Sequence, residues 1–221
     1  MPQPIAPSVR QEASRSRQSH EVLLGQDIEV LERILEPGVD LALWERDPCA
    51  SMSAWLEALP SARLPTGQLQ LRAADVASGL NAACKTSRTP SGPERDGLMA
   101  DIDMLATRFA LITGHPRMTL TLQARGRDVD ENWHFDDAGL HLLCTYSGLG
   151  AEWVASRHAD AALRAPKGFA GPFRRMPLHT VALFRGRGTD EQDCGRGLAH
   201  RSPALSSARS RRFVLRLDEL R

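Results

Sequence analysis

Two histidines and an aspartate carry the clearest chemistry in this sequence. His134 and Asp136 are two positions apart in a stretch predicted to be a β-strand, so both side chains point to the same face. His200 follows much later, in another strand-rich block. Two imidazoles and one carboxylate can occupy one face of an octahedral metal ion and leave the opposite face open, as in many ferrous sites. The sequence therefore predicts a metal site at His134, Asp136 and His200.

A pair of arginines after the second histidine could hold an acidic ligand. Arg211 and Arg212 open the apolar segment RRFVLRL. A planar guanidinium can make two charge-assisted hydrogen bonds to one carboxylate. Arg212 is the first choice because it begins the predicted strand. Arg211 is the alternative, because a shift of one residue exchanges the two faces of a strand.

The order of these residues resembles that of the Fe(II)/2-oxoglutarate dioxygenases, in which an HxD motif and a later histidine bind iron. The segments HLLCTYSGLGAEW, MPLHTVALFRG and AHRSP also resemble that superfamily. The resemblance implies Fe(II) and 2-oxoglutarate as cofactors and Arg212 or Arg211 as the clamp for the distal carboxylate. It also implies oxidative decarboxylation of 2-oxoglutarate coupled to oxidation of a C–H bond. Tyr146, the only tyrosine, could reach either the 2-oxo acid or a partner in the core.

The pattern of apolar residues predicts one domain after a disordered tail at residues 1–24. Residues 25–114 are predicted to be mainly helical, and the clearest helix begins after Pro93 and ends before Gly114. From residue 115 to 221 the pattern changes to short strands, without a helical pattern between them. This indicates an α+β fold. A double-stranded β-helix, the cupin-like jelly roll, would carry the metal site, with the helical half packed on its outside.

Composition excludes several classes of protein. Lys+Arg 28 against Asp+Glu 27 gives a net charge of +1, so we expect no general attraction to nucleic acid or to an anionic membrane. No apolar run is long enough to cross a membrane, and we expect no secretory signal in the N-terminal tail, because it lacks a continuous apolar segment. The four cysteines are scattered, which is typical of free thiols in a reducing cytoplasm. We therefore expect a cytoplasmic protein that acts on a small molecule or on another protein.

A second resemblance covers most of the chain, from about residue 25 to the end. The segments WHFDDAGLHLLCTYSGLGAEWV and CGRGLAHRSP, with a terminal LRLD at 215–218, resemble the bacterial family called domain of unknown function 1826. That family has no established reaction to carry over. Its members are often encoded near zinc-homeostasis genes, which implies a role for a metal without naming it.

Two other interpretations remain open. The first is a non-catalytic zinc-binding or zinc-homeostasis protein that uses the same His/Asp set, since thiolates such as Cys194 or Cys144 would favour zinc. The second is an interaction module without a metal, in which His134 and Asp136 form a structural pair. Substrate specificity is expected to lie in the helical half and in a loop at 156–175.

Overall fold

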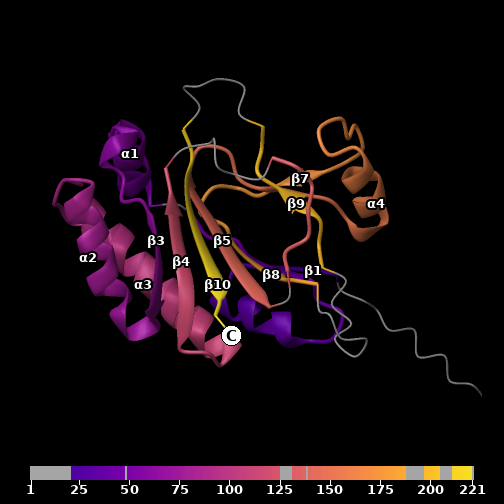
Figure 1. The fold of residues 1–221 in the computed structure, drawn as a ribbon, viewed down its shortest axis with the longest axis horizontal. Coiled ribbons are helices and arrows are strands. Elements are labelled where there is room, and N and C mark those ends of the chain that lie inside the picture. Colours follow the sequence, from indigo (N-terminus) through magenta and orange to yellow (C-terminus); the bar gives the residue numbers. More distant parts are fainter. Residues whose placement is uncertain are drawn as a thin grey trace, which may run out of the picture.

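The computed structural model describes residues 21–47, 49–124, 131–137, 139–187, 197–204 and 211–220 of the chain. Their strands form two sheets (Figure 1). The larger sheet has the order β1 (Val22–Gly25), β2 (Leu41–Trp44), β8 (Val181–Arg185), β5 (Leu140–Ser147), β10 (Phe213–Glu219), β4 (Arg117–Gln123) and β3 (Gly67–Arg72). The smaller sheet has the order β7 (Arg174–Arg175), β6 (Glu152–Trp153) and β9 (His200–Arg201). Neighbouring strands are antiparallel, except that β1 and β2 are parallel.

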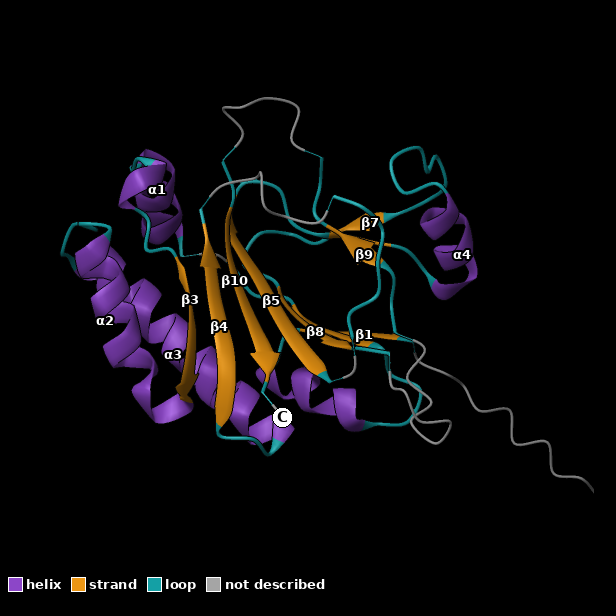
Figure 2. Cartoon of the chain, viewed as in Figure 1, coloured by secondary structure: helices purple, strands orange, loops and turns teal. Residues whose placement is uncertain are grey.

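Helices cover one face of the larger sheet, and the smaller sheet lies on the other side with one further helix. The helices and 3-10 turns are η1 (Ile28–Leu35), α1 (Ala50–Ala58), η2 (Ser61–Arg63), η3 (Ala73–Asp75), α2 (Val76–Thr86), α3 (Pro93–Thr113) and α4 (Ser156–Arg164). Figure 2 shows α1, α2 and α3 together beside the larger sheet, whereas α4 lies beyond the smaller one. In the described part of the chain, no helix has the length and apolar character that a membrane span requires.

The two faces of the larger sheet bury different side chains because successive residues of a strand point to opposite faces. On β5, Leu142, Cys144 and Tyr146 join the core formed with the helices, and we call this side the helix face. Leu143 instead packs against the cluster that contains Trp153 and Phe184, between the two sheets. We call this second side the inner face.

The longest helix forms where the sequence predicts it. Pro93 occupies its first turn, where a missing N–H costs nothing, and Gly114 ends it in the left-handed region with φ 72°. Glu94 and Asp96 lie in the first turn, where the helix dipole favours negative charge. The predicted apolar stripe is buried, at Leu98, Ile102, Leu105 and Phe109. This part of the sequence prediction is confirmed.

The mixed α+β character is confirmed, but two details of the prediction are wrong. Strands β1, β2 and β3 precede the mainly β part of the chain and lie toward the two edges of the larger sheet. Of these, β1 begins at Val22, inside the predicted tail; residues 1–20 lie outside the described part. The predicted loop at 156–175 contains α4. That helix begins where the backbone N–H and the hydroxyl of Ser156 donate to the carboxylate of Glu21, a partner too distant in sequence for a local pattern to indicate.

Candidate metal centre

The structure brings His134, Asp136 and His200 together between the two sheets. One ligand atom from each residue lies within 4.8 Å of the other two. Nε2 of His200 is 3.3 Å from Oδ2 of Asp136, and the two imidazole rings are 4.5 Å apart between centroids. This is the grouping that the sequence predicts, reached by a different local structure. The His134 segment is not a strand and forms a single bridge to His200, with reciprocal backbone hydrogen bonds of 3.0 Å.

Backbone contacts fix the segment that carries Asp136. The carbonyl of Asp136 accepts a hydrogen bond from the N–H of Arg187, at 3.0 Å, so this stretch is held by the end of β8 rather than by a regular strand ladder. A Cβ atom at Gly186 would overlap the carbonyl oxygen of Asp137. Only glycine therefore lets the end of β8 approach this closely, and a larger residue would displace the candidate ligand.

Each histidine is held by a backbone carbonyl two residues earlier. Nδ1 of His134 lies 2.9 Å from the carbonyl of Asn132, and Nδ1 of His200 lies 3.0 Å from that of Leu198. A carbonyl can only accept, so both Nδ1 atoms carry the proton, and Nε2 would be the nitrogen that coordinates a metal. The ring of Phe184 stacks on His200 at 4.3 Å and fixes its plane.

The protonation states suit a cation. Burial lowers the pKa of His200 to about 4, so the imidazole is neutral at physiological pH. Burial disfavours the charged form of Asp136, but the His200 ring and the Arg216 guanidinium favour it and hold the pKa of this carboxyl below its usual range. A neutral imidazole and an ionised carboxylate are the forms that bind a metal.

Arg212 lies on the inner face as a buried cation with neutral partners. Its side chain donates to the carbonyl of Leu149 at 2.8 Å, to the hydroxyl of Ser202 at 2.9 Å and to that of Thr145 at 3.4 Å. Among the described residues none of its partners is a carboxylate, and burial lowers the pKa of Arg212 to about 10. Arg212 directly precedes β10 rather than opening its paired part, a small difference from the prediction.

A buried hydroxyl lies close to this arginine. Thr180 directly precedes β8, and the N–H of His179 donates to the carbonyl of Thr145 at 2.9 Å, so Thr180 and Thr145 come from adjacent chain segments. Alternation along β8 places Thr180 on the same face as Ala182 and Phe184, the inner face. Its hydroxyl is buried and has no hydrogen-bond partner among the described residues. Such a group is costly unless a ligand or water satisfies it.

The other predicted residues lie elsewhere. Arg211 donates to the carbonyls of Leu59 and Glu57, so it holds the end of α1. Tyr146 points to the helix face, so of its two alternatives the structure favours the core partner and does not bring it to the metal group. Cys144 lies on the same face, fully buried, and Cys194 falls outside the described residues.

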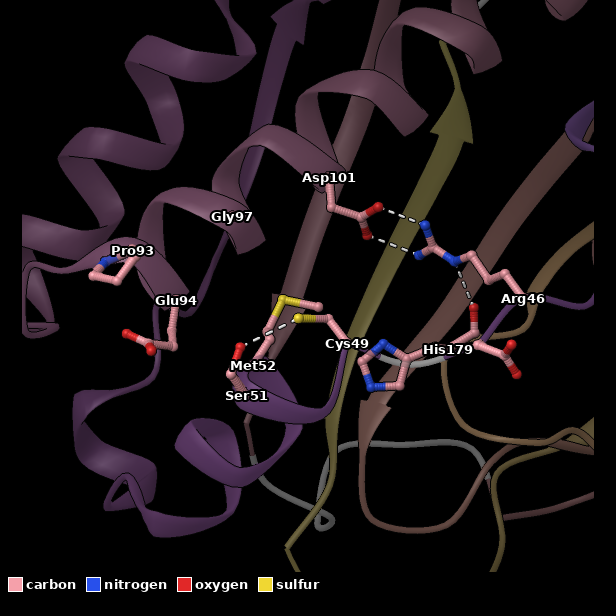
Figure 3. A pocket seen from close by; sticks show the side chains of 10 residues that line it. Arg46, Cys49, Ser51, Met52, Pro93, Glu94, Gly97, Asp101 and His179 are labelled. Atoms are coloured by element: carbon pink, nitrogen blue, oxygen red, sulfur yellow. Dashed lines mark hydrogen bonds and ion pairs between the residues drawn. The ribbon is translucent and has the colours of Figure 1, made fainter.

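A pocket of about 340 Å³ opens on the helix side, and Figure 3 shows its lining. Its central feature is an ion pair in which both Nη atoms of Arg46 contact the carboxylate of Asp101, at 2.5 and 2.7 Å. The hydroxyl of Tyr146 donates to the same carboxylate at 2.6 Å, and Arg46 also donates to the carbonyl of His179 at 2.8 Å. These polar groups satisfy one another, so the pocket shows no unmet need for a ligand.

Sequence reasoning missed a set of polar residues around Asp136. Nη2 of Arg216 lies 2.9 Å from Oδ1 of Asp136, and Nε of Arg216 lies 2.7 Å from Oδ1 of Asp218. His141 contacts the same oxygen of Asp218 at 2.7 Å. The LRLD segment contains Arg216 and Asp218, so its resemblance to the family motif could have indicated them. His141 could not be found in this way, because only the pairing of β5 with β10 brings it beside Asp218.

Comparison with solved structures finds similar chain paths at low identity, whereas no curated protein matches the sequence. The dioxygenase for auxin oxidation 1 from Arabidopsis thaliana, in complex with 2-oxoglutarate, is 14% identical over 90% of this chain and 91% of that one, with a TM-score of 0.47. A full-length protein from Neurospora crassa, in complex with α-ketoglutarate, is 13% identical, over 89% and 82%, with a TM-score of 0.40. The carbocyclase SnoK from nogalamycin biosynthesis is 11% identical, over 87% and 84%, with a TM-score of 0.39.

Comparison with protein families gives a match over nearly all of the described structure. The profile of the family DUF1826, described as proteins of unknown function, matches residues 25–218. The matched range includes all three residues of the candidate metal group and the LRLD segment. The chain therefore belongs to the DUF1826 family.

Proposed function

We propose that this protein is a mononuclear Fe(II)- and 2-oxoglutarate-dependent oxygenase, in which the two sheets form a double-stranded β-helix. One observation carries the proposal. A cluster of two histidines and one aspartate shares the inner face with a buried arginine that has no acidic partner among the described residues. A metal alone would explain the first feature. A metal together with a dicarboxylate explains both.

The donor set fits ferrous iron. His134, Asp136 and His200 would be the ligands, with two neutral nitrogens and one carboxylate oxygen on one side of the ion. Among the described residues no thiolate joins this group, and a thiolate would have favoured zinc. Bound iron would supply the oxidative chemistry by which 2-oxoglutarate is decarboxylated and a substrate C–H bond is oxidised.

The chain's own polar groups fit the far end of a dicarboxylate. Arg212 would bind the distal carboxylate with its guanidinium fork, which gains a charged partner it otherwise lacks. Ser202 and Thr145 orient that guanidinium, and the unpaired hydroxyl of Thr180 could donate to the same carboxylate. Burial strengthens these interactions, because charges attract more strongly away from water.

The first experiment compares metal content and turnover. The purified protein and its His134→Ala and His200→Ala variants are loaded anaerobically with Fe(II), and bound metal is measured by elemental analysis. We expect about one equivalent of iron in the unmodified chain, a loss of bound iron in both variants, and release of succinate from 2-oxoglutarate only when iron is bound. His158→Ala, a histidine on α4 outside the metal group, is the matched control and should behave like the unmodified chain.

Arg212→Met separates the two halves of the proposal. The variant should keep its iron, because Arg212 does not contact the three candidate ligands, but should lose 2-oxoglutarate binding in calorimetry. Truncating one partner of a buried charge pair typically costs about 2–5 kcal/mol of binding free energy. Tightly bound zinc with no 2-oxoglutarate binding in the unmodified chain would contradict the oxygenase and favour a zinc-binding protein. No bound metal at all would contradict both.

A further inference from the structure

Asp136 has two carboxylate oxygens with separate surroundings. Oδ2 is the atom near His200, at 3.3 Å, and so lies on the metal side. Oδ1 is 2.9 Å from Nη2 of Arg216, on strand β10 of the larger sheet. The side chain of Asp136 is only 5% exposed, so water does not compete freely for either oxygen.

Arg216 is itself held from the other side. Its Nε donates to Oδ1 of Asp218 at 2.7 Å, and that oxygen also accepts from Nδ1 of His141 at 2.7 Å. Nε2 of His141 donates to the backbone carbonyl of Asp137 at 2.9 Å, beside Asp136 in the chain. The contacts close a ring that starts and ends at the segment carrying the candidate ligand. The guanidinium therefore has little freedom to leave Asp136.

We propose that Arg216, held by Asp218 and His141, is a positioning residue that makes Asp136 a one-atom ligand. A carboxylate beside a divalent cation can bind through one oxygen or through both. The guanidinium occupies Oδ1, so only Oδ2 is left for the metal. His134, His200 and Oδ2 of Asp136 would then hold the metal through three atoms, and its other positions would stay open to a 2-oxo acid and to dioxygen. This inference rests on the proposed function and assigns a role to the LRLD segment.

The charge of Arg216 makes the expected phenotype unusual. A cation next to a metal ligand repels the metal, so removing it does not simply weaken metal binding. Without Arg216, Oδ1 of Asp136 can join the metal and occupy a position that the 2-oxo acid needs. Loss of the guanidinium should therefore leave metal affinity largely intact and lower the affinity for 2-oxoglutarate.

Cobalt(II) is a suitable probe because its visible absorption reports its coordination. The folded variants Arg216→Met, Arg216→Lys and Asp218→Asn are titrated first with Co(II) and then with 2-oxoglutarate. Arg117→Met, an exposed arginine on neighbouring strand β4, is the control. In Arg216→Met we expect a weaker Co(II) absorption, typical of a higher coordination number. We also expect an approximately tenfold loss of 2-oxoglutarate affinity, because Oδ1 of Asp136 competes for a position that the 2-oxo acid needs. Lysine should restore part of the affinity, and Asp218→Asn should give an intermediate value.

Two outcomes would overturn the inference, and a third would separate it from the oxygenase proposal. An unchanged Co(II) spectrum with unchanged 2-oxoglutarate affinity would mean that Arg216 does not set the binding mode of Asp136. Loss of Co(II) together with 2-oxoglutarate, with the circular dichroism and Tm preserved, would mean that Arg216 is needed for the metal itself. If the unmodified chain binds Co(II) but no 2-oxoglutarate, the oxygenase proposal fails. The role of Arg216 is then judged from the Co(II) spectrum alone, and an unchanged spectrum in Arg216→Met would reject it.

Discussion

The two faces of the larger sheet each hold an arginine, which is partly buried on the helix face and buried on the inner face, and the two arginines have opposite surroundings. On the helix face, Arg46 is paired through two Nη atoms with Asp101, which also accepts from Tyr146. On the inner face, Arg212 has only a carbonyl and two hydroxyls as partners among the described residues. Burial opposes the charge of both, but Asp101 raises the pKa of Arg46 above its ordinary value, whereas nothing offsets burial at Arg212.

The difference distinguishes Arg46, which forms a structural ion pair, from Arg212, whose charge would be paired only by a bound ligand. A folded chain normally satisfies its buried polar groups, because each unsatisfied one costs free energy. Among the described residues, the helix face follows that rule. The inner face departs from it at the hydroxyl of Thr180, which has no partner there, and at Arg212, which has hydrogen bonds but no counter-charge. Such departures are expected at functional sites, where the missing partner arrives with the ligand.

The largest expected effect on stability is on the helix face. Asp101→Asn keeps the shape of the side chain but leaves Arg46 as a partly buried cation without its counter-charge. We expect a loss of about 2 kcal/mol in the free energy of unfolding, between the values typical of exposed and of buried ion pairs. Urea unfolding measures the loss. Asp103→Asn, on the same helix and with no ion pair among the described residues, is the control and should change stability little.

Arg212→Met should cost less stability than Asp101→Asn in the absence of ligand. It removes a buried cation that has no counter-charge to lose, and it gives up only hydrogen bonds to neutral groups, so we expect a loss of about 1 kcal/mol or less. A loss as large as that of Asp101→Asn would mean that Arg212 already has an anionic partner. The comparison between the faces would then be wrong.

A second test asks whether the helix face is closed to water, and it uses Cys144. Burial raises the pKa of this thiol to about 12. In the unfolded chain a cysteine ionises near pH 8.5, roughly. Between about pH 8.5 and 10 the unfolded state therefore releases a proton that the folded state keeps, so stability falls as the pH rises, by up to about 1.4 kcal/mol per pH unit.

Cys144→Ala should remove this part of the slope. Urea unfolding at pH 8, 9 and 10 under reducing conditions measures it, and Cys49→Ala, which replaces an exposed cysteine, should keep it. An equal slope in the unmodified chain and in Cys144→Ala would mean that water reaches the thiol. The helix face would then be open to water at Cys144 as well as at the pocket beside Arg46.

Much of the fold could be predicted because its signals are local. The Pro93 start, the Gly114 end and the apolar stripe between them define α3 without any tertiary information. The alternation of β5 was less informative, since the segment HLLCTY is nearly continuous in apolar residues and either set could have faced the helices. This is why Tyr146 could be assigned to the ligand or to the core with equal reason.

The candidate site also contains residues that the local sequence indicates and residues that it does not. His134, Asp136 and His200 stand out by residue type and spacing, and the structure brings them together. Arg216 does not stand out, because basic residues are frequent near it, and its contact with Asp136 spans 80 positions. The pairing of Asp218 with His141 depends on the register of β10 against β5. A register is set by packing of the whole sheet, so no short segment of the sequence reveals it.

The smallest expected effect compares two buried threonines. The hydroxyl of Thr89 donates to the carbonyl of Arg63 at 2.7 Å, whereas that of Thr180 has no partner among the described residues. Valine has nearly the shape of threonine without the hydroxyl. Thr89→Val should therefore lose about 1 kcal/mol of unfolding free energy, and Thr180→Val should keep or gain a similar amount, because an unsatisfied buried group is removed.

Ligand binding should stabilise these two variants by different amounts. Saturating 2-oxoglutarate with Fe(II) should stabilise Thr89→Val as much as it stabilises the unmodified chain. Thr180→Val should gain less, because the hydroxyl that would donate to the distal carboxylate is gone. Thermal unfolding with and without the two ligands gives both comparisons in one experiment. A loss of stability in Thr180→Val without ligand would mean that the Thr180 hydroxyl of the unmodified chain already has a hydrogen-bond partner. The inner face would then satisfy its buried polar groups as the helix face does.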